Sequence, residues 1–142
     1  MGREKSAGAV IFRKEHGAAK YLLLHYESGH WDFVKGNVEH GEDELETVKR
    51  EAREETEIDD LRILPGFRET ISYFYRRKGD TISKEVVFYL AETKKENVRI
   101  SHEHVGFEWL GFKDAYEKIT YDNSKNVLGK ANSFLSNECP GE

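Results

Sequence analysis

The pattern of apolar and polar residues predicts short β-strands along the first part of the chain. Lys5–Arg13 contains a run of small and branched apolar side chains, and Glu15-His16-Gly17 follows it as a turn. Tyr21–Tyr26 is apolar at almost every position, which is typical of a strand that is buried on both faces. Leu61–Leu64 is another short apolar run, which ends at Pro65-Gly66. We therefore expect three strands separated by turns in this region.

A β-hairpin is predicted in the middle of the chain. Phe67–Arg76 and Ile82–Glu92 have the composition of two antiparallel strands, and Lys78-Gly79-Asp80 between them has the composition of a turn. Val86–Ala91 is the most hydrophobic run in the sequence, so we expect the second of these strands to lie at the centre of a sheet. Val105–Leu110 predicts one more short strand.

The last part of the chain is predicted to be helical. Asp114–Ile119 is a short candidate helix, and Ser124 is placed to cap a longer one. The longer helix has an apolar stripe that we expect to pack on the core, formed by Val127, Leu128, Ala131, Phe134 and Leu135. Strands that alternate with a few helices indicate an α/β or α+β fold. A chain of 142 residues is the size of one domain, residues 1–142.

Composition narrows the classes of partner. The net charge of −5 provides no basic surface for non-specific nucleic-acid binding, so we expect no DNA partner. No apolar run is long enough to span a bilayer and no N-terminal signal pattern is present, so we expect no membrane partner. Cys139 is the only cysteine, which excludes a disulfide framework. Together these features predict a soluble cytoplasmic protein.

Gly36–Ile58 combines a glycine loop with a strongly acidic helix. At about 100° per residue, four of its carboxylates fall on one arc, which we call the acidic arc: Glu44, Glu51, Glu54 and Glu55. The neighbouring arc, which we expect to pack on the core, holds Leu45, Val48, Ala52 and Thr56. Ion pairs of Arg50 with Glu46 and Glu54 fit an ordinary solvated helix. The like-charged pair Glu51–Glu55 fits a hard divalent cation better, such as Mg²⁺ or Mn²⁺, and spacing alone leaves both interpretations open.

This segment resembles the Nudix box. The residues that carry the resemblance are Gly36, Glu42, Arg50, Glu51, Ala52, Glu54, Glu55 and Ile58. Glu57 departs from the pattern, because the box has a glycine there that ends the helix, and the helix end therefore stays open. The resemblance implies a mixed β-sheet sandwiched between α-helices. It also implies divalent cations, Mg²⁺ or Mn²⁺, held by Glu51, Glu54 and Glu55 with the Gly36 carbonyl.

Ser101-His102-Glu103-His104 is a second cluster of polar residues. An extended segment would place His102 and His104 on one face and Glu103 on the other. One interpretation is a zinc site built on the two histidines, and another is a polar loop at the rim of a site. The third, which we favour, is that Glu103 reaches the metal site, because many Nudix enzymes use a glutamate outside the box as a ligand or a base.

A narrower resemblance extends from about Ala7 to Leu135. Motifs such as Lys35-Gly36, Gly41-Glu42-Asp43 and Ser101–His104 resemble those of the asymmetrical diadenosine tetraphosphate hydrolases. The resemblance implies that a polyphosphate is bound by His30, Lys35 and Lys84. It also implies that an adenine ring is held by Tyr73 and Tyr121. Simpler interpretations stay open: Lys84 as a surface lysine, Tyr73 as a core residue and His30 as a turn residue.

The expected function is Mg²⁺-dependent hydrolysis of a dinucleoside polyphosphate, with cleavage of diadenosine tetraphosphate to ATP and AMP. Glu54 and Glu103 are the candidates for the general base, and Arg50 would orient the glutamates. The substrate could instead be another nucleoside diphosphate derivative, such as ADP-ribose, a damaged nucleotide or an RNA 5′ end. From a different class, the chain could be a non-catalytic nucleotide-binding regulator.

Overall fold

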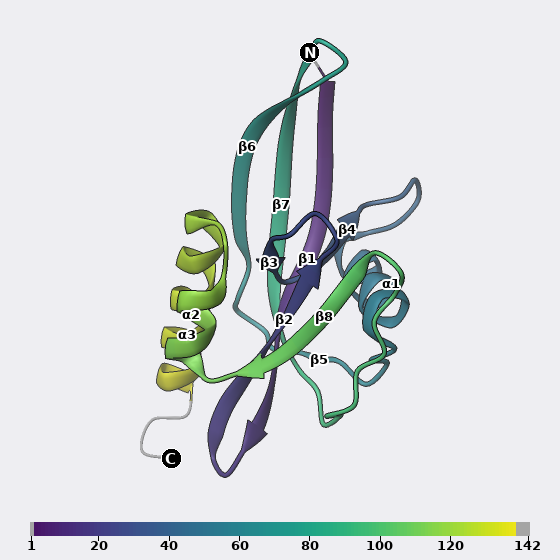
Figure 1. The fold of residues 1–142 in the computed structure, drawn as a ribbon. Helices are drawn as coiled ribbons and strands as arrows, with labels where there is room; N and C mark the ends of the chain where they lie inside the picture. The colour runs from purple at the N-terminus through teal and green to yellow at the C-terminus, as the bar shows by residue number, and fades with distance from the viewer. Residues whose placement is uncertain (1, 139–142) are drawn as a thin grey trace.

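The computed structural model describes residues 2–138, and Cys139 lies outside this range. Within it, eight strands form one mixed sheet and three helices pack around them (Figure 1). The strands are β1 (Gly2–Glu15), β2 (Ala18–Tyr26), β3 (Trp31–Asp32), β4 (Val34–Asn37), β5 (Arg62–Ile63), β6 (Glu69–Arg77), β7 (Asp80–Glu92) and β8 (His104–Leu110). The helices are α1 (Glu44–Thr56), α2 (Phe112–Lys118) and α3 (Asp122–Glu138). None of the helices in residues 2–138 is long and apolar enough to cross a membrane.

Strand β1 is the centre of the sheet. One edge pairs in parallel with β7 along almost its whole length, from Gly2↔Ile82 to Phe12↔Glu92. The other edge pairs antiparallel with β4 in its first half and with β2 in its second half. The remaining strands pair antiparallel with β7 or β2. The sheet is therefore mixed, as the resemblance to the Nudix box implied.

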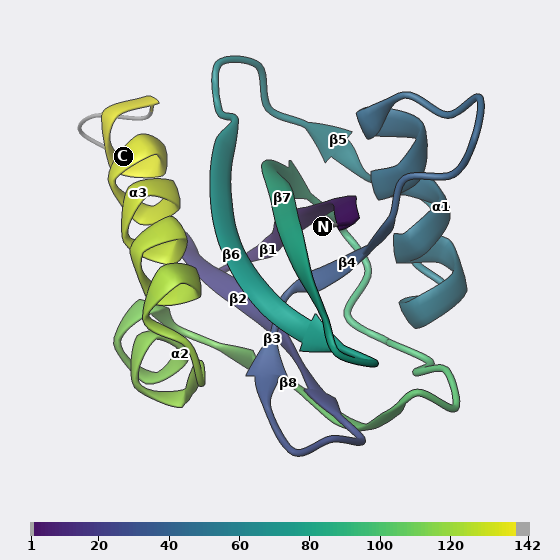
Figure 2. The same ribbon diagram turned by 90° about the horizontal axis from the view of Figure 1, so that it is seen from above.

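Alternating residues of β1 bury both faces of the sheet. Val10 and Phe12 belong to a core cluster with residues of α2 and α3. Ala9 and Ile11 face the other way, into a cluster that contains Val48 and Ala52 of α1. Figure 2 shows the resulting layers, with α1 beside one face and α2 and α3 beside the other. The predicted sheet between helices is confirmed, and β2 is buried on both faces as its composition indicated.

The predicted hairpin is formed by β6 and β7, and its register places the aromatic residues of β6. Tyr73 pairs with Lys84, and Tyr75 pairs with Ile82. Because side chains alternate along a strand, Tyr73 and Tyr75 share one face and Phe74 points to the other, where it is 67% exposed. Of this aromatic run, Tyr73 is therefore next to Lys84 and half-exposed rather than a core residue.

Two details of the helices differ from the expectation. Ser124 does not cap α3, because the helix begins at Asp122 and the Lys125 amide donates to the Tyr121 carbonyl. Leu45, in the first turn of α1, is 38% exposed, because it lines a surface pocket with Lys5 and Tyr89 and is not part of the core. The apolar stripe of α3 does pack on the core, as predicted.

Candidate active site

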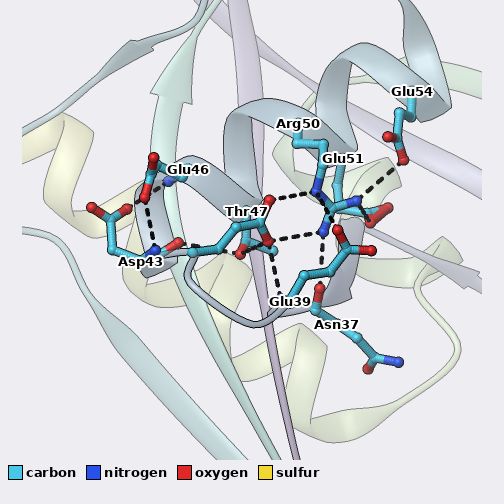
Figure 3. Close-up of polar contacts among 9 residues, drawn as sticks. Asn37, Glu39, Asp43, Glu46, Thr47, Arg50, Glu51 and Glu54 are labelled. Atoms are coloured by element: carbon cyan, nitrogen blue, oxygen red, sulfur yellow. Dashed lines mark hydrogen bonds and ion pairs between the residues drawn. The ribbon is translucent and has the colours of Figure 1, made fainter.

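The helix α1 starts at a complete capping box. The Asp43 carboxylate accepts from the Glu46 amide at 2.8 Å, and the Glu46 carboxylate accepts from the Asp43 amide at 2.9 Å (Figure 3). Two amides that would otherwise lack a partner are satisfied in this way. Glu46 is consequently used at the cap, and the predicted Glu46–Arg50 ion pair does not form. The cap fixes the point at which the glycine loop becomes a helix.

The helix ends at Thr56, and Glu57 takes the position where the Nudix box has glycine. Its backbone is left-handed, with φ 61° and ψ 20°, and its amide donates to the Arg53 carbonyl. A left-handed backbone costs an ordinary residue roughly 1–2 kcal/mol relative to glycine. Glu57 therefore terminates the helix as the glycine would, at some cost in stability.

Arg50 is the centre of an ion-pair network on α1. Its Nε and Nη2 donate to the two carboxylate oxygens of Glu42, at 2.6 and 3.1 Å. Its Nη1 donates to Glu51 at 2.7 Å and to Glu54 at 3.2 Å, and Nη2 also reaches the Asn37 carbonyl at 3.0 Å (Figure 3). The hydrogen bonds from Arg50 lower the pKa of Glu42 to about 2. One guanidinium thus fixes three glutamates and the glycine loop relative to one another.

Gly36 lies directly against the Glu51 carboxylate. A Cβ atom at residue 36 would come within 2.0 Å of Glu51 Cδ. Only glycine allows this approach, so the Gly36 backbone and the Glu51 side chain form one surface. Arg50 binds Oε2 of Glu51 and Oε1 of Glu54, so it occupies one oxygen of each carboxylate.

Glu55 is the buried member of the acidic arc. It is 5% exposed, and its Oε1 has no hydrogen-bond partner among the described residues. Burial, and then the neighbouring Glu51, raise the pKa of Glu55 well above its usual range. In residues 2–138 no three His, Cys, Asp or Glu side chains converge in a ready metal-binding geometry. The donor set nevertheless fits a hard cation, because oxygen ligands and a buried, unpartnered carboxylate are what Mg²⁺ or Mn²⁺ would satisfy.

The segment 99–104 is anchored on the end of α1. The Ser101 amide donates to the Glu55 carbonyl at 3.1 Å, and the Arg99 amide donates to the Thr56 carbonyl at 3.1 Å. Glu103 is exposed, and its negative charge contributes to raising the pKa of Glu55. Glu103 therefore lies within electrostatic range of the acidic arc, although it is distant in sequence.

The prediction that His102 and His104 share a face was wrong. Residues 102 and 103 form a turn, closed by the His104 amide, which donates to the Ser101 carbonyl at 3.1 Å. His102 is exposed, whereas His104 is buried beside Glu55. Since the two imidazoles have different surroundings, the zinc interpretation of this pair is excluded.

A cavity of about 570 Å³ brings together four of the five predicted substrate residues. Its lining is formed by Tyr26, His30, Asp32, Lys35, Ile71, Tyr73, Tyr121, Asn123 and Ser124. Tyr73 and Tyr121 are 37% and 52% exposed, so both rings are accessible from solvent. The Lys35 Nζ atom lies 3.2 Å from Oδ2 of Asp32. The positive charge of Lys35 also acts on Glu55, where it opposes the rise in the pKa of that carboxyl group. The cavity therefore borders the acidic arc.

His30 is held within this cavity by aromatic contacts. Its ring stacks on Tyr26, with centroids 4.5 Å apart and planes 8° apart, and Tyr121 lies 5.5 Å away. Its Nδ1 is 2.9 Å from the Ser28 hydroxyl. Burial lowers the pKa of His30, while Asp32 opposes this shift. These contacts leave the ring in a fixed orientation.

Lys84 is the predicted substrate residue that is not part of the cavity lining. Its Nζ donates to Asn37 Oδ1 at 2.9 Å and to Glu4 at 3.4 Å. Burial lowers its pKa, and Glu4 opposes this shift. Lys84 therefore lies beside the glycine loop, between the acidic arc and Tyr73 of the neighbouring strand.

Sequence reasoning missed Tyr26, and it considered His104 only as a zinc ligand and not as a neighbour of Glu55. Tyr26 was assigned only to a buried strand, but its hydroxyl donates to the Phe33 carbonyl at 2.6 Å, and burial raises its pKa. The Tyr26 ring also contacts His104 edge-on at 4.5 Å. A tyrosine at the last position of an apolar strand, just before a turn, was the available signal for a residue at the border of the sheet.

Comparison with known proteins places this architecture in a family. The model of the NUDIX domain matches residues 2–129. The bis(5′-nucleosyl)-tetraphosphatase [asymmetrical] of Mus musculus is 37% identical to the chain, and the match covers 92% of this chain and 95% of the mouse protein. The protein of the same name from Caenorhabditis elegans is also 37% identical, and the match covers 93% of this chain and 96% of the nematode protein. The structure of a C. elegans Ap4A hydrolase binary complex superimposes with a TM-score of 0.84 at 36% identity, covering 94% of this chain and 98% of the other. The chain belongs to the NUDIX domain family.

Proposed function

We propose that the chain is a Mg²⁺-dependent hydrolase of dinucleoside polyphosphates that cleaves diadenosine tetraphosphate to ATP and AMP. The observation that carries the proposal is the cavity with two accessible tyrosines that borders a set of oxygen donors fitted to a hard cation. A dinucleoside polyphosphate has a base to stack and a phosphate chain to hold, and this arrangement suits both. The names of the similar mouse and nematode proteins support the same substrate.

Glu51, Glu54, Glu55 and the Gly36 carbonyl are the residues proposed to hold the cation. When bound there, the cation would supply Lewis-acid chemistry, neutralising phosphate charge and making a water molecule more acidic. Arg50 holds Glu51 and Glu54 through charge-assisted hydrogen bonds. Its role is to orient these carboxylates rather than to contact the substrate.

Five side chains outside the box are proposed to bind the substrate. Tyr73 and Tyr121 stack on an adenine ring, at about 1–3 kcal/mol per stacked base. The polyphosphate is held by the other three, His30, Lys35 and Lys84. Because Lys84 pairs across the hairpin with Tyr73 and donates to Asn37, it is suited to contact phosphates that leave the cavity toward the acidic arc.

Glu103 is the stronger candidate for the general base. The Glu54 carboxylate is shared with Arg50 at 3.2 Å. Glu103 is exposed, and within residues 2–138 its side chain takes part in no ion pair. A carboxylate that no cationic side chain holds is free to approach a water molecule, which a base requires.

Product analysis tests the proposed reaction. Purified protein is incubated with diadenosine tetraphosphate and Mg²⁺, and the nucleotides are separated by anion-exchange chromatography. We expect equal amounts of ATP and AMP, and no turnover in excess EDTA. Two molecules of ADP would contradict asymmetrical cleavage.

A substrate panel separates this proposal from the other Nudix substrates. Diadenosine tetraphosphate, ADP-ribose, an oxidised deoxynucleoside triphosphate and an RNA with a 5′ triphosphate are compared by kcat/KM. We expect diadenosine tetraphosphate to be the best substrate. If another compound of the panel were turned over much faster, that compound would take the place of diadenosine tetraphosphate as the proposed substrate. If the protein bound these compounds but hydrolysed none of them, it would be identified as a non-catalytic regulator.

A further inference from the structure

Two buried polar atoms face each other beneath the acidic helix. Glu55 Oε1 and His104 Nε2 lie 3.3 Å apart, yet neither has a hydrogen-bond partner among the described residues. The His104 side chain is 0% exposed and that of Glu55 is 6% exposed. An unsatisfied buried polar atom costs about 1–3 kcal/mol, so two such atoms at this distance indicate a contact that is made in another state of the site.

The surroundings of His104 determine which of its nitrogens carries the proton. Its Nδ1 lies 3.1 Å from the Ser101 hydroxyl, which itself accepts from the Glu103 amide at 3.4 Å. The hydrogen of that hydroxyl is therefore available to Nδ1. A neutral imidazole whose Nδ1 accepts a hydrogen bond carries its proton on Nε2. The proton then points toward Glu55 Oε1.

His104 cannot easily turn away from this contact. The Tyr26 ring packs against it edge-on at 4.5 Å, and Ser101 is tied to the Glu55 backbone at 3.1 Å. The imidazole, the Ser101 hydroxyl and the end of α1 are consequently held as one unit. An ionised carboxylate only accepts hydrogen bonds, so an ionised Glu55 is the natural partner for the Nε2 proton.

We infer that His104 is a positioning residue, whose Nε2–H holds Oε1 of Glu55 and leaves the other carboxylate oxygen for the divalent cation. The inference rests on the proposed function, because it assigns Glu55 to the cation. Ligating carboxylates are commonly oriented by such a hydrogen bond, and losing the partner typically lowers metal affinity about 10–100-fold. His104 touches neither the substrate nor the reacting atoms in this assignment.

Two substitutions of His104 separate orientation of Glu55 from filling of space. In His104→Gln the amide nitrogen can take the place of Nε2 and still donate to Glu55. In His104→Asn it can take only the place of Nδ1, beside Ser101. Exposed His102 provides the matched control, His102→Gln, on the same turn.

The measurement is a calorimetric titration of each protein with Mn²⁺ alone, without nucleotide. We expect His104→Asn to bind Mn²⁺ about 10–100-fold more weakly than the wild type, and His104→Gln and His102→Gln to bind it as the wild type does. Equal affinity of His104→Asn and wild type, or equal losses in the Gln and Asn variants, would overturn the inference. Wild-type protein that binds no Mn²⁺ would contradict the proposed function itself, and the inference with it.

Two further readouts keep the inference testable if His104→Asn does not fold. Ser101→Ala removes the group that faces Nδ1, and we expect it to weaken Mn²⁺ binding, so unchanged affinity would count against the inference. Long-range ¹H–¹⁵N spectra of the wild type, saturated with Mg²⁺, report the tautomer directly. We expect the Nε2–H form at His104, and the Nδ1–H form would overturn the inference.

Discussion

The acidic arc borders the cavity that is lined by Tyr73 and Tyr121, but the two regions are built from the chain in different ways. The carboxylates of the acidic arc all come from residues 36–58, and Arg50 binds Glu42, Glu51 and Glu54 within that segment. The cavity draws its side chains from β2, the following turn, β6 and the start of α3. Local sequence therefore specifies the residues proposed to hold the cation, whereas the topology of the sheet brings together the residues proposed to bind the substrate.

The largest effect is expected at Glu55. Glu55→Gln replaces a proposed ligand of the cation, and a catalytic cation stabilises the charge of the transition state by several kcal/mol. We therefore expect kcat to fall by about 10³-fold. Because Glu55 is buried and its pKa is raised by burial and by Glu51, the neutral side chain should also raise the melting temperature in EDTA. Steady-state kinetics and calorimetry check the two results. Full turnover in this variant would remove the metal mechanism.

Arg50 should show the next largest effect. Arg50→Lys cannot donate to both Glu42 oxygens and to Glu51 at once. Loss of such an orienting contact lowers activity about 10–100-fold, and we expect the fall in kcat with little change in KM. Arg53→Lys, exposed on the same helix, is the matched control and should behave like the wild type. A rise in KM alone would make Arg50 a substrate ligand instead.

The tyrosines of the cavity should affect binding more than catalysis. Tyr73→Ala and Tyr121→Ala should each raise KM about tenfold, because a stacked base contributes about 1–3 kcal/mol, while kcat stays within a small factor of the wild type. Phenylalanine at either position should restore KM. Phe74→Ala on the opposite face of β6, at a residue that is 67% exposed, is the control. An equal effect of Phe74→Ala would argue against the cavity as the adenine site.

Glu44 shows that charges on α1 also serve stability. It accepts from Arg68 at 2.8 Å, from Lys5 at 2.6 Å and from the Tyr89 hydroxyl at 2.5 Å, and these bonds, that of Arg68 first, lower its pKa to about 2. Because the pKa of Glu44 is lower in the folded state than its ordinary value of 4.5, the ionised carboxylate stabilises the folded protein at pH values above 4.5. This stabilisation is lost as the pH falls from 4.5 through about 2. Glu44→Gln should therefore cost about 1 kcal/mol at pH 7.

The same substitution should flatten the pH dependence. Denaturant unfolding measured between pH 4.5 and pH 2 is expected to show a smaller loss of stability in Glu44→Gln than in the wild type. Parallel curves for the two proteins would mean that the ion pairs of Glu44 contribute nothing to the unfolding free energy.

The smallest effect is expected at the end of α1. Glu57→Gly relieves the left-handed backbone of residue 57 and should raise the unfolding free energy by about 0.5–1 kcal/mol, after the greater chain entropy of glycine is subtracted. Glu57→Ala keeps the Cβ atom and should give no such gain. Equal stability of the glycine and wild-type proteins would show that the φ of 61° carries no strain.

The sequence predicted local features well, because their contacts are local. The acidic helix within residues 36–58 and the β6–β7 hairpin were both predicted, whereas the end of α1 stayed open because Glu57 replaces the glycine of the box. The contacts of His104 with Tyr26 and Glu55 were missed because the three residues lie on different segments. The cap of α3 was misplaced because Tyr121, which precedes the first residue of the helix and accepts from the Lys125 amide, has no side chain that marks a cap. The site outside residues 36–58 is created when the sheet brings distant segments together, and a pattern along one chain does not contain that information.

A crystal structure of Glu55→Gln with diadenosine tetraphosphate and Mg²⁺ tests most directly whether both regions act on one substrate. The slow variant should keep the intact nucleotide in the site. We expect one adenine between Tyr73 and Tyr121, and a cation-bound phosphate beside Gly36 and Glu51. An adenine outside the cavity, or a phosphate chain that does not approach Glu51, would contradict this assignment.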